Sequence, residues 1–363
     1  MTFTSRSCAC RHGRRRGGEL RIMEVKAMKR GNLCWLIAIV VLCMFLSPNL
    51  TVAASYYEGK TIKLIIGSGA GGAYDQIARL FAKHLPKYLP GKPVIVPENM
   101  PGASSMIAAN HIYNTAKPDG LTFGTINRGL PFAQLLKVDG VRFDMKKYAW
   151  IGSGAVEATV LVIRTDLPYK TIDDLRKAKD PIHLAGLGPG ASDNQFPSLL
   201  KEFLGLNFKM VIYPSGNEGK LAIERKEVDG KAGSYSAFPQ MIQRGVVRVL
   251  VRGRVSEHGI ENVPVDEDLV TDPKGKTVMA MRSTIDFFGR PYVAPPGTPP
   301  EVMSLLRDGF AKAAKDSQLQ EEAKKLMLEI QYVPAEECLS KVNYIFSQPE
   351  EVVKEFGKYI TFQ

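Results

Sequence analysis

The stretch TIKLIIGSGAGGAYDQIARLFAKHL, residues 61–85, decides the fold. The apolar run 62–66 predicts a buried strand, and a glycine-rich turn follows it. Beyond the turn, the residues at spacings i, i+3, i+4, i+7 and i+8 predict an amphipathic helix; they are Ile77, Leu80, Phe81, His84 and Leu85. A strand, a glycine turn and a helix in this order indicate an α/β unit.

The same alternation continues along the chain. Short apolar runs predict strands at residues 94–96, 121–126, 160–163, 182–185, 209–212 and 247–251. Helical patterns lie at 105–113, 171–178, 195–204, 218–225, 301–315, 319–327 and from 335 onward. Thr171 is placed to cap the second of these helices with Asp174, and Thr298 to cap the helix at 301–315. We therefore expect parallel-rich sheets covered by helices on both faces.

Length and order predict two lobes. Residues 55–363 suffice for two domains of about 150 residues each. We expect lobe one to comprise 55–155 and 288–363, and lobe two to comprise 156–287. The helical tail would return to lobe one, so the chain would cross between the lobes twice, near Trp150 and near Phe287.

The first 54 residues have the layout of a leader. Lys29 and Arg30 precede the apolar run 33–46, and small residues follow at Ala53 and Ala54. The run is shorter than the roughly 20 residues of a membrane helix, which favours cleavage after Ala53 or Ala54 over a permanent anchor. Residues 1–27 are interpreted as an over-long gene start. We expect export to the periplasm.

Composition argues against several functions. The formal net charge is +11, but the leader contributes nine Lys/Arg and two Asp/Glu, so about +4 remains and no nucleic-acid partner is expected. Cys338 is the single cysteine after the leader. The histidines are scattered, and the sequence contains no H-E-x-x-H motif and no G-x-S-x-G elbow. We expect a monomer that is not an enzyme and has no metal or cofactor.

The first glycine turn predicts an anion site. Its glycines leave backbone N–H groups accessible at the positive end of a helix dipole. Candidate ligand-binding residues here are Ser68, Ala70, Gly71, Gly72, Ala73, Tyr74 and Asp75. The alternative is a purely structural turn, in which Asp75 caps the helix and does not contact a ligand.

Further turns follow other strands in both halves of the chain, at 99–103, 186–192 and 214–219. Open α/β sheets bind ligands at the carboxyl ends of their strands, which predicts a cleft between the lobes. The candidates in lobe one are Asn99, Gly102, Ala103 and Asn127. Those in lobe two are Gly190, Ser192, Asn194, Tyr213, Ser215, Gly216, Asn217 and Tyr235.

A second hypothesis remains open. Gly67, Gly69 and Gly72 also satisfy the dinucleotide pattern G-x-G-x-x-G, and Glu98 could serve as the ribose-binding acid. The chain would then be an exported nucleotide-dependent oxidoreductase. Export counts against this hypothesis, because the enzyme would have to obtain NAD outside the cytoplasm.

Four ordered segments, 60–85, 97–103, 117–122 and 294–299, together resemble the substrate-binding receptors of tripartite tricarboxylate transporters, the Bug-type family. The resemblance covers nearly the whole chain after the leader. It implies a type II periplasmic-binding-protein fold without catalysis. It also implies delivery of a carboxylate, such as citrate, a dicarboxylate, an acidic amino acid or an aromatic acid, to integral-membrane transporter subunits.

The resemblance further implies that backbone amides and ordered waters hold the ligand carboxylate, here at 68–75 and 213–217. This chain departs from the family at both turns. The lobe-two turn usually reads Pro-Tyr-Lys-Gly, whereas residues 213–216 read Tyr-Pro-Ser-Gly and lack the lysine. The first turn reads Gly-Ser-Gly at 67–69, where Pro-Phe is usual. A receptor that signals to a sensor protein is a further alternative.

Overall fold

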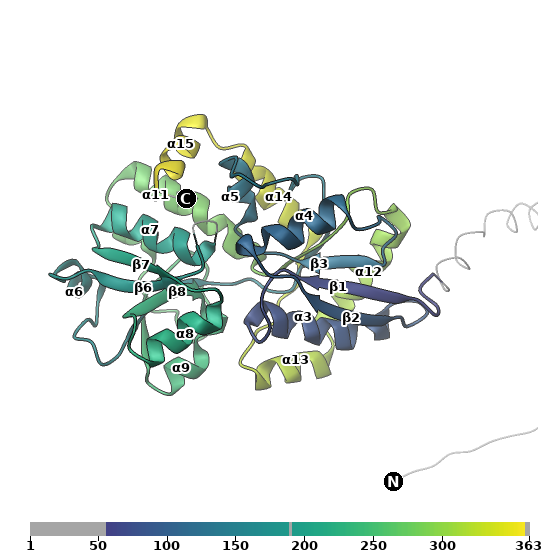
Figure 1. Ribbon diagram of the computed structural model, residues 1–363, viewed down its shortest axis with the longest axis horizontal. Helices are drawn as coiled ribbons and strands as arrows, with labels where there is room; N and C mark the ends of the chain where they lie inside the picture. The colour runs from purple at the N-terminus through teal and green to yellow at the C-terminus, as the bar shows by residue number, and fades with distance from the viewer. Residues whose placement is uncertain (1–55, 189–190, 360–363) are drawn as a thin grey trace, which may run out of the picture. The chain divides into compact units, whose positions relative to one another are not determined.

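The computed structural model describes residues 56–188 and 191–359 (Figure 1). The expected leader, with its cleavage site, lies outside these residues. Two separate sheets organise the described chain. We call the part built on the six-stranded sheet lobe one, and the part built on the five-stranded sheet lobe two.

The sheet of lobe one has the strand order β11-β4-β10-β3-β1-β2. Its strands are β1 (Thr61–Ile66), β2 (Val94–Asn99), β3 (Thr122–Thr125), β4 (Ala149–Ser153), β10 (Pro291–Ala294) and β11 (Val333–Pro334). The sheet of lobe two has the order β7-β6-β8-β5-β9. Its strands are β5 (Thr159–Arg164), β6 (Ile182–Gly186), β7 (Phe208–Ile212), β8 (Gly230–Ser234) and β9 (Val247–Arg252).

Helices flank both sheets. Those associated with lobe one are α3 (Ala73–His84), η1 (Leu85–Tyr88), η2 (Ala103–Ser105), α4 (Met106–Asn114), α5 (Leu130–Leu135), α12 (Pro300–Ala314), α13 (Ser317–Lys325) and α14 (Ala335–Phe346). Those between β5 and β10 are α6 (Ile172–Arg176), α7 (Ser192–Leu204), α8 (Gly216–Glu224), η3 (Tyr235–Ala237), α9 (Pro239–Gln243), α10 (Asp266–Leu269), α11 (Pro273–Ser283) and η4 (Thr284–Phe288). The last helix is α15 (Glu350–Tyr359).

The first strand, β1, is an interior strand of its sheet and contributes apolar residues to the core on both faces. β1 lies between β2 and β3 and is parallel to both. Ile62, Leu64 and Ile66 pack in the apolar cluster that contains residues of α3 and α12, whereas Ile65 belongs to the cluster that contains residues of α4. Residues two apart in a strand point to the same face, which explains this division. The turn after β1 is thereby fixed by core packing.

Parallel pairing holds only in part. β1–β3 are mutually parallel, as are β6 with β7 and with β8. The strands next to the passages between lobes pair antiparallel: β10 with β3 and β4, and β5 with β8 and β9. The chain leaves one lobe and enters the other at the same end of the strands, so the first strand after each crossing, β5 or β10, runs antiparallel to its neighbours.

The chain passes to lobe two between β4 and β5 and returns between β9 and β10. The two passages are hydrogen-bonded to each other: Gly154 N–H donates to Arg290 C=O (2.9 Å), and Glu157 N–H donates to Asp286 C=O (2.9 Å). The fold is therefore the expected two-lobed α/β architecture with two crossings. The boundaries 155/156 and 287/288 stay a prediction.

The C-terminal helix contacts both lobes. α15 packs on α7 and α11, with the Tyr359 ring 5.2 Å from that of Phe203. Its Phe356 ring lies 4.6 Å from Phe132, on α5 of lobe one. The tail was expected to return to lobe one alone. The additional contact with lobe two arises because the apolar face of α15, with Phe356 and Tyr359 three residues apart, lies against residues of both lobes.

Local signals at helix ends were right in one case and wrong in another. Thr171 and Asp174 form the predicted capping box of α6. Thr298 does not cap α12, because Pro299 occupies the N-cap and the Thr298 hydroxyl donates to Pro295 C=O (2.8 Å).

Among the helices of the described residues, none is long and apolar enough to cross a membrane.

Candidate functional site

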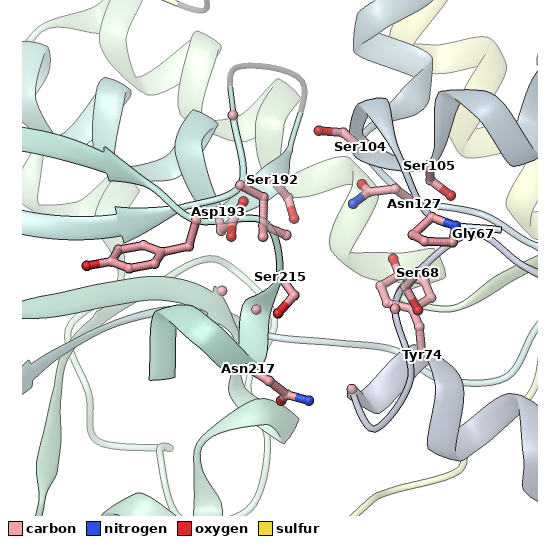
Figure 2. A pocket seen from close by; sticks show the side chains of 18 of the residues that line it. Gly67, Ser68, Tyr74, Ser104, Ser105, Asn127, Ser192, Asp193, Ser215 and Asn217 are labelled. Atoms are coloured by element: carbon pink, nitrogen blue, oxygen red, sulfur yellow. The ribbon is translucent and has the colours of Figure 1, made fainter. Parts of the chain in front are cut away.

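A cavity of about 830 Å³ lies between residues of the two lobes. Figure 2 shows side chains that face it, with Ser68 and Tyr74 from lobe one and Ser192 and Asn217 from lobe two. The first residues of four helices, α3, α4, α7 and α8, line it. Each helix N-terminus presents unpaired N–H groups and about half a positive charge. The cavity is thus surrounded by anion-attracting backbone from both lobes.

The turn between β1 and α3 is held by its own side chains. Gly71 N–H donates to Asp75 Oδ2 (2.9 Å), and Asn99 Nδ2 donates to Asp75 Oδ1 (2.8 Å) and to Ser68 C=O (2.9 Å). Burial alone would raise the pKa of Asp75, but hydrogen bonds from Arg79, Gly71 and Asn99 hold it below the ordinary value. Asp75 thus braces the turn, although the N-cap of α3 is Gly72 and has no side-chain cap bond, so Asp75 is not the helix cap expected in the structural alternative.

The second wall of lobe one has an unusual backbone. Gly102 has φ +128°, and Ala103, Ser104 and Ser105 follow with φ of +43°, +53° and +79°. Three consecutive non-glycine residues in the left-handed region store strain, of about 1 kcal/mol or more each. The buried hydroxyl oxygens of Ser68 and Ser105 have no hydrogen-bond partner among the described residues. Strain and unpaired hydroxyls in a cavity wall are typical of a binding site.

Lobe two supplies a corresponding braced loop. Asn194 Oδ1 accepts hydrogen bonds from Leu187 N–H (3.0 Å) and Gly188 N–H (3.1 Å). Asn217 Nδ2 donates to Ala70 C=O across the cleft (3.4 Å). The two lobes therefore already touch at the glycine turn.

Charged residues of the cavity are mostly cations. Its described lining contains Lys220, Lys231 and Arg290 but a single acid, Asp193. Lys231 is ion-paired with Asp193, and Arg290 Nη2 lies 2.7 Å from Glu157 Oε1, outside the lining. Once both ion pairs are counted, Lys220 leaves the described lining with an excess of positive charge.

Tyr74 connects the cavity to the crossings. Its hydroxyl donates to Gly289 C=O (3.1 Å) and accepts from Arg128 N–H (3.1 Å). The Arg290 guanidinium lies 4.3 Å from the centre of the Tyr74 ring. A residue at the first turn of α3 is thus hydrogen-bonded to the second passage at Gly289 and to the segment between β3 and α5 at Arg128.

Thirteen predicted ligand-binding residues line the cavity: Ser68, Ala70, Gly72, Ala73, Tyr74, Gly102, Ala103, Asn127, Ser192, Tyr213, Ser215, Gly216 and Asn217. Five predicted residues lie beside it and not in the lining: Gly71, Asp75, Asn99, Asn194 and Tyr235. Gly190 is outside the described residues. Of these five, Asp75, Asn99 and Asn194 hold the loops in place.

Several lining residues were not foreseen, including Ser104, Ser105, Asp193, Lys220, Lys231 and Arg290. Lys220 could have been found, because it lies one helical turn after Gly216. Arg290 offered no local signal, since it lies in the second crossing and reaches the cavity only in the folded chain.

The dinucleotide hypothesis finds no further support at Glu98. Its carboxylate Oε2 lies 3.3 Å from Lys63 Nζ in a pair whose side chains are 47% and 54% exposed. Glu98 is not among the described residues that line the cavity.

Comparisons with known proteins agree on one family. The family model described as tripartite tricarboxylate transporter family receptor matches residues 77–357. A UPF0065 protein of Bordetella pertussis is 30% identical over 294 residues, which cover 79% of this chain and 85% of that protein. A UPF0065 protein of Cupriavidus necator is 26% identical over 315 residues, covering 84% and 90%.

Solved structures share the fold. The periplasmic binding protein BugD has a TM-score of 0.68 at 22% identity, over 84% of this chain and 99% of that one. MatC from Rhodopseudomonas palustris with bound malate has a TM-score of 0.66 at 20% identity, over 81% and 98%. An R. palustris protein with adipate has a TM-score of 0.67 at 18% identity, over 82% and 97%. Because the family model spans most of the sequence, this chain belongs to the tripartite tricarboxylate transporter receptor family.

Proposed function

We propose that the protein is a periplasmic receptor that captures a small organic carboxylate between its lobes and delivers it to the membrane subunits of a tripartite tricarboxylate-type transporter. One observation carries this proposal: the N-termini of four helices, from both lobes, line one cavity. An anion there meets several N–H donors without a large rearrangement.

The charge of the cavity supports the same conclusion. Its described lining has three cationic side chains and one acid. A carboxylate would be stabilised both by the helix dipoles and by this excess of positive charge. The malate and adipate bound to the two R. palustris proteins are carboxylates of fitting size and charge.

Capture requires that the ligand favour a closed state. A ligand shifts an equilibrium between open and closed lobes only by the difference in its affinity for them. A carboxylate that bonds to the turn at Gly72 and to the turn at Ser215 contacts both lobes only when they are close. The closed form is then what the membrane subunits recognise.

The test is isothermal titration and thermal shift of the purified protein with di- and tricarboxylates, acidic amino acids, aromatic acids, NAD and NADP. A ligand at 100 times its Kd adds about 2.7 kcal/mol of stability, enough to raise Tm by several degrees. Stabilisation by a carboxylate supports the receptor. Stabilisation by NAD alone would favour the oxidoreductase instead.

The variant Gly72→Asp tests whether the glycine turn before α3 binds the ligand. Gly72 is the N-cap of α3 with extended backbone, and an added Cβ would meet only Gly69 C=O, at 3.9 Å. Aspartate is a favoured N-cap, so the fold should be kept or stabilised. Its carboxylate would occupy the N–H groups that we assign to the ligand and repel a second anion. Ser304→Asp, on an exposed position of α12, adds the same charge elsewhere. Equal affinity in both variants would refute the assignment of this turn.

A further inference from the structure

The wall of lobe two contains a buried ion pair. Lys231 on β8 and Asp193 on α7 are both 5% exposed, and the ammonium contacts Asp193 Oδ2. Asp193 Oδ1 is buried with no hydrogen-bond partner among the described residues. Because the two charges cancel, this pair adds no net attraction for an anion. The acid also lies in the first turn of α7, where it offsets the dipole of that helix.

Lys220 differs from the other cations of the cavity. Arg290 is paired with Glu157, and Lys231 with Asp193. The half-buried Lys220 ammonium has no carboxylate within ion-pair distance in the described part of the chain. Glu224, one turn further along α8, is paired with Arg244 instead. Lys220 is thus the cation of the described cavity lining that has no ion-pair partner, although the more distant Glu224 partly offsets its charge.

The environment of Lys220 makes this positive charge costly. Burial, and then the neighbouring charge of Lys231, lower the pKa of Lys220 from its ordinary value. An anion beside it would remove that cost. Lys220 also lies in the second turn of α8, whose N-terminal residues Gly216 and Asn217 line the cavity. Glu218 also lies in the first turn of α8, but it is exposed and is not among the described residues that line the cavity. Lys220 and the start of α8 therefore form the anion-attracting part of lobe two.

We propose that Lys220 binds a second anionic group of the ligand, so that the receptor selects acids with two anionic ends over monocarboxylates. This inference rests on the proposed function, which assigns the first carboxylate to the turn of lobe one before α3. The two ends of a dianion would then bridge the lobes. A monocarboxylate would leave the Lys220 charge unpaired in a closed cleft.

The expected effect follows from the energy of a charge-assisted hydrogen bond. Removing a hydrogen bond to a charged group corresponds to about 10- to 100-fold in affinity. The loss should appear only for ligands with the second charge. A side chain that acts merely through packing would weaken both kinds of ligand alike.

The experiment compares each dicarboxylate with its monoamide of the same length by isothermal titration. The probes are succinate and succinamate, glutarate and glutaramate, and adipate and adipamate. The variants are Lys220→Met, which keeps the length and removes the charge, and Lys220→Arg, which keeps the charge. Lys209→Met, exposed on β7 outside the cavity lining, removes one charge from the same lobe as a control.

The native protein and Lys209→Met should prefer the dicarboxylate of one pair. Lys220→Met should lower that affinity about 10- to 100-fold and leave the monoamide nearly unchanged, whereas Lys220→Arg should retain the preference. Equal binding of both members of every pair, or equal losses in Lys220→Met, would overturn this inference while leaving the receptor function intact. Absence of binding by every carboxylate tested overturns the proposed function and this inference together.

Discussion

The sharpest test of the first turn is Gly67→Ala. Gly67 N–H donates to Thr125 C=O (2.9 Å), which ties the end of β1 to β3. A Cβ at Gly67 would lie 1.8 Å from Ser105 Oγ, 3.0 Å from Ser105 Cβ and 3.2 Å from the Thr125 carbonyl oxygen. Ordinary contacts between such atoms are about 3.5 Å. The hydroxyl can rotate away, but the other two atoms belong to a strained turn and to the sheet.

We therefore expect Gly67→Ala to lower the free energy of unfolding by about 1 to 3 kcal/mol, the usual cost of overpacking. For a chain of this size that corresponds to a fall in Tm of about 2 to 6 °C. Adding Ser105→Gly removes two of the three close contacts and the left-handed strain at φ +79°. The double variant should recover more than half of the loss.

Calorimetric unfolding of the native protein, the single variants Gly67→Ala and Ser105→Gly, and the double variant forms a thermodynamic cycle. Gly69→Ala is the matched control, because nothing lies within 4 Å of its Cβ and its φ is not positive. It should leave Tm unchanged or raise it slightly. If Gly67→Ala is as stable as Gly69→Ala, or if Ser105→Gly gives no recovery, the close approach of the two walls is not what fixes this turn.

Three further variants probe the braces and buried groups. Burial and the charge of Glu157 raise the pKa of Glu257 to about 8, so the folded state retains a proton that the unfolded chain loses near 4.5. This stabilisation is present below pH 4.5 and is lost as the pH rises to about 8. In urea unfolding, Glu257→Gln should reduce the decrease of the free energy of unfolding over this pH range by on the order of 1 to 2 kcal/mol. Phe356→Ala should cost about 3 kcal/mol by urea unfolding, since the buried ring packs on Phe132; a loss below 0.5 kcal/mol would show that α15 does not hold the lobes. Asn194→Ala frees two backbone amides and should cost about 1 to 3 kcal/mol; Asn194→Asp, which keeps an acceptor, should recover most of this loss in the same assay.

Much of the architecture was predictable because it follows local patterns. The strand and helix at 61–85 are specified by apolar spacing, and the glycines between them mark the turn. Thr171 likewise carried its own capping signal, since both partners of the box are three residues apart. Thr298 did not, because the adjacent proline took the N-cap.

The details of the cavity were less predictable, for two physical reasons. Ser104 and Ser105 adopt positive φ. A glycine such as Gly102 indicates this conformation in a sequence, whereas a serine does not. Lys231 and Arg290 acquire their place from the pairing of distant strands and from the crossing of the chain, so no nearby residue indicates it. Asn194 was found by its position beside a turn, but its role as a brace depends on which way its amide points.

The bonded crossings make one part of the cleft a pivot. Because the passages at Gly154 and Arg290 are joined directly, a rotation of one lobe moves nearby atoms little and distant atoms more. Tyr74 is hydrogen-bonded to Gly289, next to this pivot. Asn217 Nδ2 and Ala70 C=O meet across the cleft at 3.4 Å, through a longer hydrogen bond. A longer ligand would stop the rotation at a wider angle than a shorter one. The angle between the lobes of the closed receptor would then depend on the length of the ligand, and a protein that recognises the closed form would encounter that difference.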